Sequence, residues 1–224
     1  MITGVTISGA DDSVDPSALV ALSAEFPFVE WAILLSDKRL GTPRYPSRDW
    51  MARLLSGPPL RLAAHLCGQH TRNFLTTGTS FLHERFARIQ VNGWRRPEAE
   101  ALDNMRHEKR LILQCRSEDT LQQVANDAAA LGNADVLFDP SGGRGIESFR
   151  YPPTPYGCHL GFAGGIGPEN VCDVVGEISM GAGVRPDFWI DMESGVRDQH
   201  DAFSLGRVRL LLGQVAGLMK RAAA

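Results

Sequence analysis

Lysine is scarce in this 224-residue sequence, in which three lysines accompany twenty arginines. Schiff-base chemistry depends on a lysine amine that reaches the reacting carbon. Only Lys38 follows a segment that we predict to be a strand, whereas Lys109 precedes one and Lys220 lies near the C-terminus. The sequence therefore argues against an aldolase of the Schiff-base type.

A strong charge of either sign is also missing. The formal net charge is −3 and no basic stretch is interleaved with aromatic residues, so the electrostatic footprint of a nucleic-acid partner is lacking. No apolar run is long enough to cross a bilayer, and the first residues lack the basic start and apolar core of a signal peptide. We expect a cytoplasmic protein that binds neither nucleic acid nor a membrane.

Cysteine is too sparse for a disulfide scaffold. The four cysteines lie far apart and show no paired zinc-ligand spacing: Cys67, Cys115, Cys158 and Cys172. We therefore expect reduced thiols. We also expect no cofactor.

Short apolar runs alternate with helical patterns along the whole chain, and most of the runs end at small or polar residues. The composition shows no linker, so we expect a single domain over 1–224. Runs without strict alternation are typical of strands that are covered on both faces. Eight strands are predicted, over 3–7, 30–35, 61–66, 88–91, 110–114, 135–138, 159–163 and 188–191.

Helical periodicity separates most of these strands. In one helix Pro168 suits the first helical position, and valine and isoleucine recur at helical spacing before Gly181 ends the pattern. The proline-rich segment 146–157 is typical of a long loop. Helices are predicted over 17–26, 47–56, 71–78, 96–107, 118–132, 168–181 and 201–219.

Alternating strands and helices allow either an open doubly wound sheet or a closed barrel. Eight units in 224 residues average about 28 residues each, which favours a compact (β/α)8 TIM barrel. In that fold the chemistry lies at the C-terminal ends of the strands. Candidate site residues are therefore those that directly follow each apolar run.

Two glycine-containing loops follow the last two predicted strands. Gly164 and Gly165 come after the seventh strand, and Ser194 and Gly195 come after the eighth. Loops in these positions commonly bind phosphate in barrels, because free backbone N–H groups converge there and a Cβ atom would obstruct the anion. We predict a phosphate site, with simple tight turns as the alternative.

Four segments carry a resemblance to a known family: TPRY at 42–45, VLFDPSGGRG at 136–145, GFAGGIGPENV at 161–171 and IDMESGVRDQHD at 190–201. They resemble the motifs of phosphoribosylanthranilate isomerase, a ribulose-phosphate-binding barrel of tryptophan biosynthesis. The resemblance covers the C-terminal half well and the N-terminal half thinly. It implies an Amadori-type aldose–ketose isomerisation and a small phosphorylated metabolite as the ligand.

The resemblance also implies roles for individual residues. Asp139 aligns with the acid that protonates the sugar-ring oxygen, Arg44 with the arginine for the substrate carboxylate, and Asp191 with the aspartate near the amine. Gly143 would join the phosphate-binding loops. Arg144 replaces a small residue of the family's GGTG pattern and would bring a positive charge into the pocket.

The sequence departs from the family at the catalytic base. Ser8, in TISG, occupies the place of the family's catalytic cysteine, and Thr6 occupies that of a lysine. A serine hydroxyl does not ionise near neutral pH and needs another group to take its proton. Unless Asp11 or Asp12 supplies the base, we expect weak ordinary isomerase activity and an altered substrate or chemistry.

A metal site is an alternative interpretation of the segment HLCGQH at 65–70. The side chains of His65, Cys67 and His70 can all bind a metal, and Asp37 and Asp139 could complete the set of ligands. A metal-dependent ribulose-phosphate epimerase has a pattern comparable to HLC at its third strand. A strand-end histidine bonded to the backbone beside a buried cysteine is the simpler interpretation, so we predict no metal. A non-catalytic barrel that binds a phosphorylated metabolite also stays open, as does the choice between monomer and homodimer.

Overall fold

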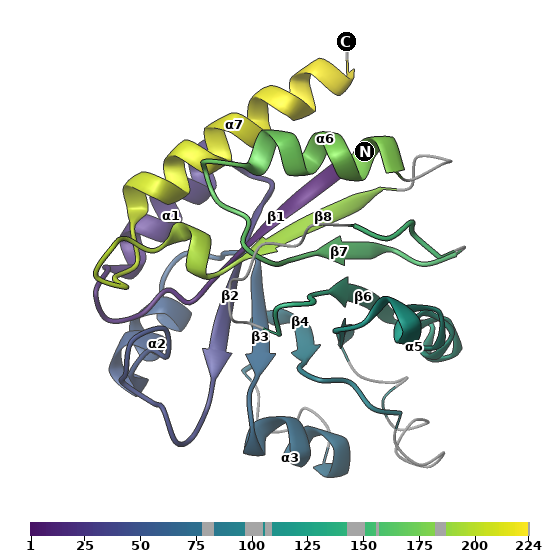
Figure 1. The fold of residues 1–224 in the computed structure, drawn as a ribbon. Helices are drawn as coiled ribbons and strands as arrows, with labels where there is room; N and C mark the ends of the chain where they lie inside the picture. The colour runs from purple at the N-terminus through teal and green to yellow at the C-terminus, as the bar shows by residue number, and fades with distance from the viewer. Residues whose placement is uncertain are drawn as a thin grey trace.

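The computed structural model is a closed barrel of eight parallel strands that neighbour one another in chain order, as Figure 1 shows. The structure describes residues 1–77, 83–96, 105, 109–142, 151–155, 157–181 and 187–223. The strands are β1 (Ile2–Ser8), β2 (Val29–Leu35), β3 (Leu62–Leu66), β4 (Phe86–Val91), β5 (Arg110–Cys115), β6 (Ala134–Phe138), β7 (Leu160–Phe162) and β8 (Phe188–Met192).

The predicted barrel is confirmed, because β8 pairs with β1 and closes the sheet. Thr6 of β1 lies opposite Asp191 of β8, so the first and last strands bring residues 185 positions apart into register. All eight predicted strands are present, each with bounds within two residues of those expected. A closed ring leaves no exposed sheet edge.

The helices lie outside the ring of strands, and α6 and α7 run side by side along the upper edge of Figure 1. No helix in the part of the chain that the structure describes is both long and apolar enough to span a bilayer. The predicted helix over 96–107 lies largely outside the described residues. The helices are α1 (Pro16–Glu25), α2 (Arg48–Ser56), α3 (Gln69–Thr77), α5 (Glu118–Leu131), α6 (Val171–Gly181) and α7 (Leu205–Ala223).

The start of α6 differs from the sequence prediction. The helix begins at Val171, and residues 168–170 form a turn instead of the first helical positions. The Asn170 side chain holds this turn, since its Oδ1 accepts the N–H of Gly167 at 2.9 Å and its Nδ2 donates to the carbonyl of Gly165 at 3.1 Å. Such side chain to backbone bonds compete with helix formation.

A small apolar layer fills the middle of the barrel. It is separate from the larger core between strands and helices, and it consists of Ile112, Leu137, Ala163 and Trp189. The Trp189 ring occupies the space beside Gly161, where an added Cβ would lie 2.2 Å from the ring. Glycine at that position therefore makes room for the indole.

A charged cluster lies on the side of this layer nearer the N-terminal ends of the strands. Arg88 bonds to Glu30 at 2.7 Å and to Asp135 at 3.3 Å, and its guanidinium lies 4.7 Å from the Trp189 ring centroid. We call these four residues the barrel floor. Arg110 also bonds to Asp135, at 2.6 Å, so two arginines balance the two carboxylates of this cluster.

Candidate functional site

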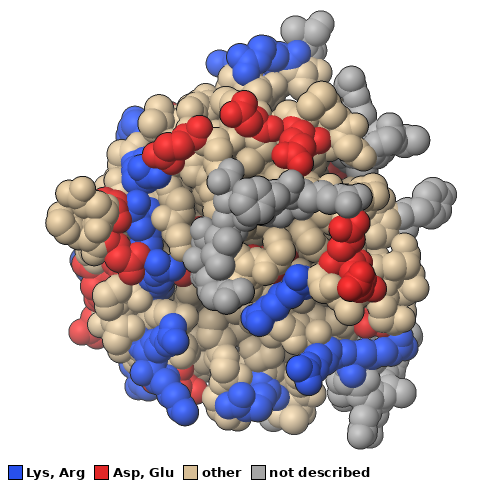
Figure 2. All heavy atoms as spheres, viewed as in Figure 1, with Lys and Arg blue, Asp and Glu red and all other residues tan. Residues whose placement is uncertain are grey.

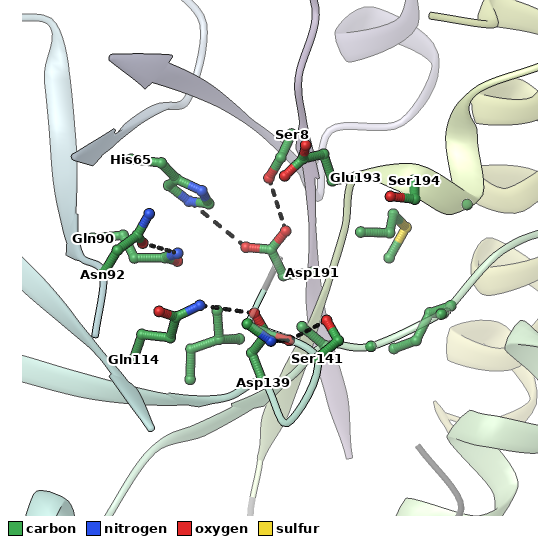
Figure 3. A pocket seen from close by; sticks show the side chains of 18 of the residues that line it. Ser8, His65, Gln90, Asn92, Gln114, Asp139, Ser141, Asp191, Glu193 and Ser194 are labelled. Atoms are coloured by element: carbon green, nitrogen blue, oxygen red, sulfur yellow. Dashed lines mark hydrogen bonds and ion pairs between the residues drawn. The ribbon is translucent and has the colours of Figure 1, made fainter. Parts of the chain in front are cut away.

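A cavity of about 570 Å³, including open solvent, lies at the C-terminal ends of the strands. Its polar side chains come from six strands or the loops that follow them, and Figure 3 shows them pointing inward. They are Ser8, His65, Gln90, Asn92, Gln114, Asp139, Ser141, Asp191, Glu193 and Ser194. The glycines of the loops after β7 and β8 line the same cavity.

Asp191 lies near the centre of this cavity and is buried. Its Oδ1 accepts a hydrogen bond of 2.8 Å from the Ser8 hydroxyl. Burial raises the pKa of Asp191 to about 8; the Ser8 hydrogen bond opposes this rise, whereas the negative charges of Asp139 and Glu193 reinforce it. Asp191 therefore carries a proton at neutral pH.

His65 of β3 faces the other oxygen of Asp191. Its Nε2 lies 3.6 Å from Oδ2 of Asp191, which is beyond hydrogen-bonding distance. Burial, followed by the positive charge of Arg88, lowers the pKa of His65 to about 3. The pair is thus a protonated carboxyl group beside a neutral imidazole.

Asp139, which follows β6, is held in a different way. Its two oxygens accept hydrogen bonds from Gln114 Nε2 at 2.7 Å, Ser141 Oγ at 2.7 Å and the N–H of Gly142 at 3.1 Å. The orientation of the Gln114 amide is fixed, because its Oε1 accepts the N–H of Gly93 at 2.8 Å. Asp139 therefore accepts three hydrogen bonds through both of its oxygens, whereas Asp191 accepts one, from Ser8.

Three buried polar atoms in the cavity lack a hydrogen-bond partner among the described residues. They are Nε2 of His65, Oε1 of Gln90 and Oδ2 of Asp191. Nearly all buried polar groups in folded proteins are paired, so orphaned groups mark positions where a ligand or water completes the bonding. Their gathering in one cavity makes it the candidate binding site.

The loop after β7 borders the cavity with Gly164 and Gly165. Both adopt positive φ, at 115° and 63°, a region that favours glycine. Within the described part of the chain, no protein acceptor bonds to the backbone N–H of either residue or of Ser194 and Gly195. None of these four amides is thus committed to a protein acceptor among the described residues.

Gly195 has a packing role as well. A Cβ at this position would lie 1.9 Å from the carbonyl oxygen of Ile166, so the loops after β7 and β8 touch through backbone. The close contact between the two loops therefore requires glycine at position 195.

Arg44 lies at the edge of the cavity, and the N–H groups of its guanidinium already bond to protein acceptors. Its guanidinium bonds to Glu193 at 2.7 Å, to Asp201 at 2.6 Å and to the hydroxyl of Ser194 at 3.1 Å. Burial raises the pKa of Glu193 in spite of this ion pair. A substrate carboxylate on Arg44 would have to displace one of these partners.

Neither Asp11 nor Asp12 lies beside Ser8. Asp11 bonds to Arg197 at 3.0 Å and to the N–H of Arg44 at 2.6 Å, and such bonds outweigh burial, so the pKa of Asp11 is lowered. Asp12 accepts the N–H of Ser47. The partner of the Ser8 hydroxyl is Asp191 instead.

The candidate metal ligands of the third strand point to different partners. His65 faces Asp191, Cys67 accepts a bond from Asn92 at 3.3 Å, and His70 pairs with Asp37 at 3.1 Å. Among the residues that the structure describes, no three His, Cys, Asp or Glu side chains gather as a metal site would require.

Two predicted site residues, Gly143 and Arg144, lie outside the described residues. Other site residues were missed from the sequence, namely Gln90 and Gln114, and His65 was considered only as a metal ligand. A signal for them exists, because each is a polar residue within an apolar strand whose neighbours are buried.

The fold has been observed before. No family profile and no curated protein sequence matches the chain. A phosphoribosylanthranilate isomerase from Thermus thermophilus is similar over 96% of this chain and 99% of its own, with a TM-score of 0.63 and 20% identity.

Two further structures give the same result. A phosphoribosylanthranilate isomerase in complex with reduced 1-(o-carboxyphenylamino)-1-deoxyribulose 5-phosphate has a TM-score of 0.63 and 19% identity, covering 97% of this chain and 100% of its own. TrpF from Jonesia denitrificans has a TM-score of 0.64 and 14% identity, with 97% and 98% covered. The resemblance seen in the loop motifs is thus confirmed at the level of the fold: the chain has the (β/α)8 barrel of the phosphoribosylanthranilate isomerases.

Proposed function

We propose that the protein is an isomerase that converts a phosphorylated aldose, or its amine adduct, into the corresponding ketose, with a substrate or chemistry altered from that of phosphoribosylanthranilate isomerase. The observation that carries the proposal is the cavity itself. Two carboxyl groups in contrasting environments, Asp139 and Asp191, share it with unpaired backbone amides and orphaned polar atoms.

The phosphate is assigned to the loops after β7 and β8. The free amides of Gly164, Gly165, Ser194 and Gly195 border one cavity, and converging amides bind phosphoryl oxygens without a cationic side chain. A structurally similar isomerase was solved with a phosphorylated deoxyribulose analogue, which supports a phosphorylated ligand here.

The two carboxyl groups divide the proton transfers. Asp191, protonated at neutral pH, donates to the ring oxygen as the ring C–O bond breaks; Asp139, an acceptor in all its hydrogen bonds, takes the proton from C2. Return of that proton to C1, with loss of the O2 hydroxyl proton to Asp191, yields the ketose. The resemblance alone had implied that Asp139 is the acid.

Ser8 is a positioning residue in this scheme. Its hydroxyl donates to Asp191 and so holds the carboxyl group in place, and the scheme requires no proton to be taken by the serine. Serine in place of the family's cysteine removes one base, but Asp139 and Asp191 still supply the proton-transfer groups that this scheme needs.

Rescue of a tryptophan auxotroph that lacks the isomerase tests the proposal. Since weak ordinary isomerase activity is expected to remain, we expect slow growth with the wild-type chain at high expression, no growth with Asp139→Asn or Asp191→Asn, and slow growth with Ser8→Ala. Purified Asp variants that are still folded at the growth temperature would show that lost growth reflects lost chemistry. Rescue by both Asp variants would refute the scheme.

A non-catalytic barrel that binds a phosphorylated metabolite is the second candidate. The occupied guanidinium of Arg44 and the serine at position 8 favour it, because both depart from what the resemblance implies. Failure of rescue at high expression, together with a thermal shift caused by ribulose 5-phosphate, would support binding without this reaction.

A further inference from the structure

A second hollow adjoins the cavity at the barrel mouth. It measures about 1260 Å³ including open solvent, and it shares Leu34, Asn92, Gly142 and Glu193 with the first cavity. Three exposed arginines line it, Arg39, Arg72 and Arg116, and we call this hollow the arginine basin. In Figure 2, basic side chains gather on the lower part of the face, with few acidic ones among them.

The three arginines come from separate elements and are held by neutral partners. Arg39, after β2, lies 5.3 Å from the Tyr45 ring centroid. Arg72, on α3, donates to the Gln69 side chain at 2.7 Å. Arg116, after β5, bonds only at 3.4 Å to its neutral partner, the Gln114 side chain.

None of these three guanidinium groups pairs with a carboxylate among the described residues. Arg44, which also lines the basin, is by contrast neutralised by Glu193 and Asp201. Three uncompensated positive charges around one hollow attract a multiply charged anion, and the planar donor fork of arginine fits phosphate and carboxylate oxygens.

We propose that the arginine basin binds a second anionic group of the substrate, a phosphate at the end of the molecule remote from the Gly164–Gly165 loop. The inference rests on the proposed function, since it assumes that the first phosphate is held at that loop. A carboxylate would use the same arginines, but a dianion balances three positive charges better than a monoanion does. The substrate class is then a sugar derivative with anionic groups at both ends.

Isothermal titration with three probes tests the inference at one ionic strength. Ribulose 5-phosphate carries one phosphate, ribulose 1,5-bisphosphate carries two, and 6-phosphogluconate carries a phosphate and a carboxylate. We expect the bisphosphate to bind at least about tenfold tighter than the monophosphate. The affinity of 6-phosphogluconate should exceed that of the monophosphate by a smaller factor. The double variant Arg72→Gln/Arg116→Gln should reduce the bisphosphate advantage below about threefold.

Two control variants separate the possible outcomes. Arg221→Gln, an exposed arginine in the last turn of α7, should leave the advantage unchanged. Gly165→Val should weaken the binding of all three probes. Equal affinities of monophosphate and bisphosphate for the wild-type chain would overturn the inference and leave the proposed function standing if Gly165→Val still abolishes monophosphate binding.

The remaining outcomes are equally decisive. If the double variant still binds the bisphosphate more tightly than the monophosphate by the wild-type factor, the second anion binds elsewhere, and the assignment to the arginine basin is overturned. If 6-phosphogluconate gains as much affinity over the monophosphate as the bisphosphate does, and the double variant loses that gain, the basin binds a carboxylate and the assignment to phosphate is overturned. If no probe binds the wild-type chain, the phosphate loop is wrong, and both the proposed function and the inference fall with it.

Discussion

The Ser8 hydroxyl donates a hydrogen bond of 2.8 Å to Oδ1 of Asp191, joining the first and last strands at the mouth of the barrel. A residue that looks like a lost nucleophile in the sequence is therefore the polar partner of a buried acid. The other oxygen of Asp191 has no hydrogen bond among the residues that the structure describes, and it lies toward His65 in the cavity. This asymmetry gives the carboxyl group one bonded oxygen for placement and one for a ligand.

Asp191→Asn should stabilise the protein above neutral pH. The raised pKa of about 8 means that the folded chain binds a proton between about pH 4 and pH 8 that the unfolded chain does not. Stability contributed by this group is therefore lost as pH rises through that window. An asparagine removes the penalty, so the melting temperature at pH 8 should rise, by roughly 2–4 °C for each kcal/mol.

At pH 4 the advantage of Asp191→Asn should largely vanish, because the Asp191 carboxyl group of the wild-type chain is then protonated in the folded state and takes up a proton in the unfolded state as well. Asp139→Asn is the matched control. It places an NH2 group against donors that now bond to a carboxylate, so it should destabilise by roughly 1–3 kcal/mol. Thermal unfolding at pH 4, 6 and 8 checks both variants; an Asp191→Asn chain that melts lower throughout would contradict the burial argument.

Gly165→Val should abolish the binding of ribulose 5-phosphate. Gly165 has φ of 63°, where a β-branched residue is strained, and a side chain would obstruct the free amides of the loop. Gly213→Ala, on α7 with open space at its Cβ position, is the control and should leave affinity unchanged. Calorimetric titration gives the affinities, and circular dichroism shows whether the valine variant is folded; unchanged affinity in a folded variant would refute the phosphate assignment.

Gly195→Ala should destabilise the fold itself. The new Cβ would lie 1.9 Å from the Ile166 carbonyl, which forces the two loops apart, at an expected penalty of about 1–3 kcal/mol. Gly176→Ala, on α6 with nothing nearby, should instead be neutral or stabilising by about 0.4–1 kcal/mol. Urea unfolding of both variants measures the difference, and equal stabilities would show that the contact relaxes without strain.

Arg44→Ala should destabilise the protein even without ligand. The substitution leaves Glu193 half-buried without its 2.7 Å ion pair, at an expected penalty of roughly 1–3 kcal/mol because the pair is only partly shielded. Glu193→Gln in the same background should recover part of the loss. A double-mutant cycle from denaturant unfolding measures the coupling, and additive effects would mean that Arg44 is free for a ligand.

Short-range patterns in the sequence were enough to predict the barrel and the residues at the C-terminal ends of its strands. The carboxyl ends of the parallel strands lie at the same end of the barrel, so residues such as Asp139 and Gly164 could be assigned to one rim before any contact was known. The pairing of Ser8 with Asp191 could not, because it depends on closure between the first and last strands. The neutralisation of Arg44 by Asp201 depends likewise on contact across 157 positions.

The direction of a side chain was harder to predict than its position. His65 and Cys67 are two residues apart at the end of β3, yet one faces Asp191 and the other contacts Asn92 in the adjoining hollow. Protonation was harder still, since burial from all sides raises the pKa of Asp191 and no local motif reports such burial.

The apolar layer in the middle of the barrel excludes water but does not screen charge. Arg88 lies on its far side, stacked on Trp189, and its positive charge still lowers the pKa of His65. Low-dielectric material transmits an electric field farther than solvent does. The proton affinity of His65 in the cavity is thus partly set from beneath the cavity, and a replacement of Arg88 would change it while leaving every residue that lines the cavity in place.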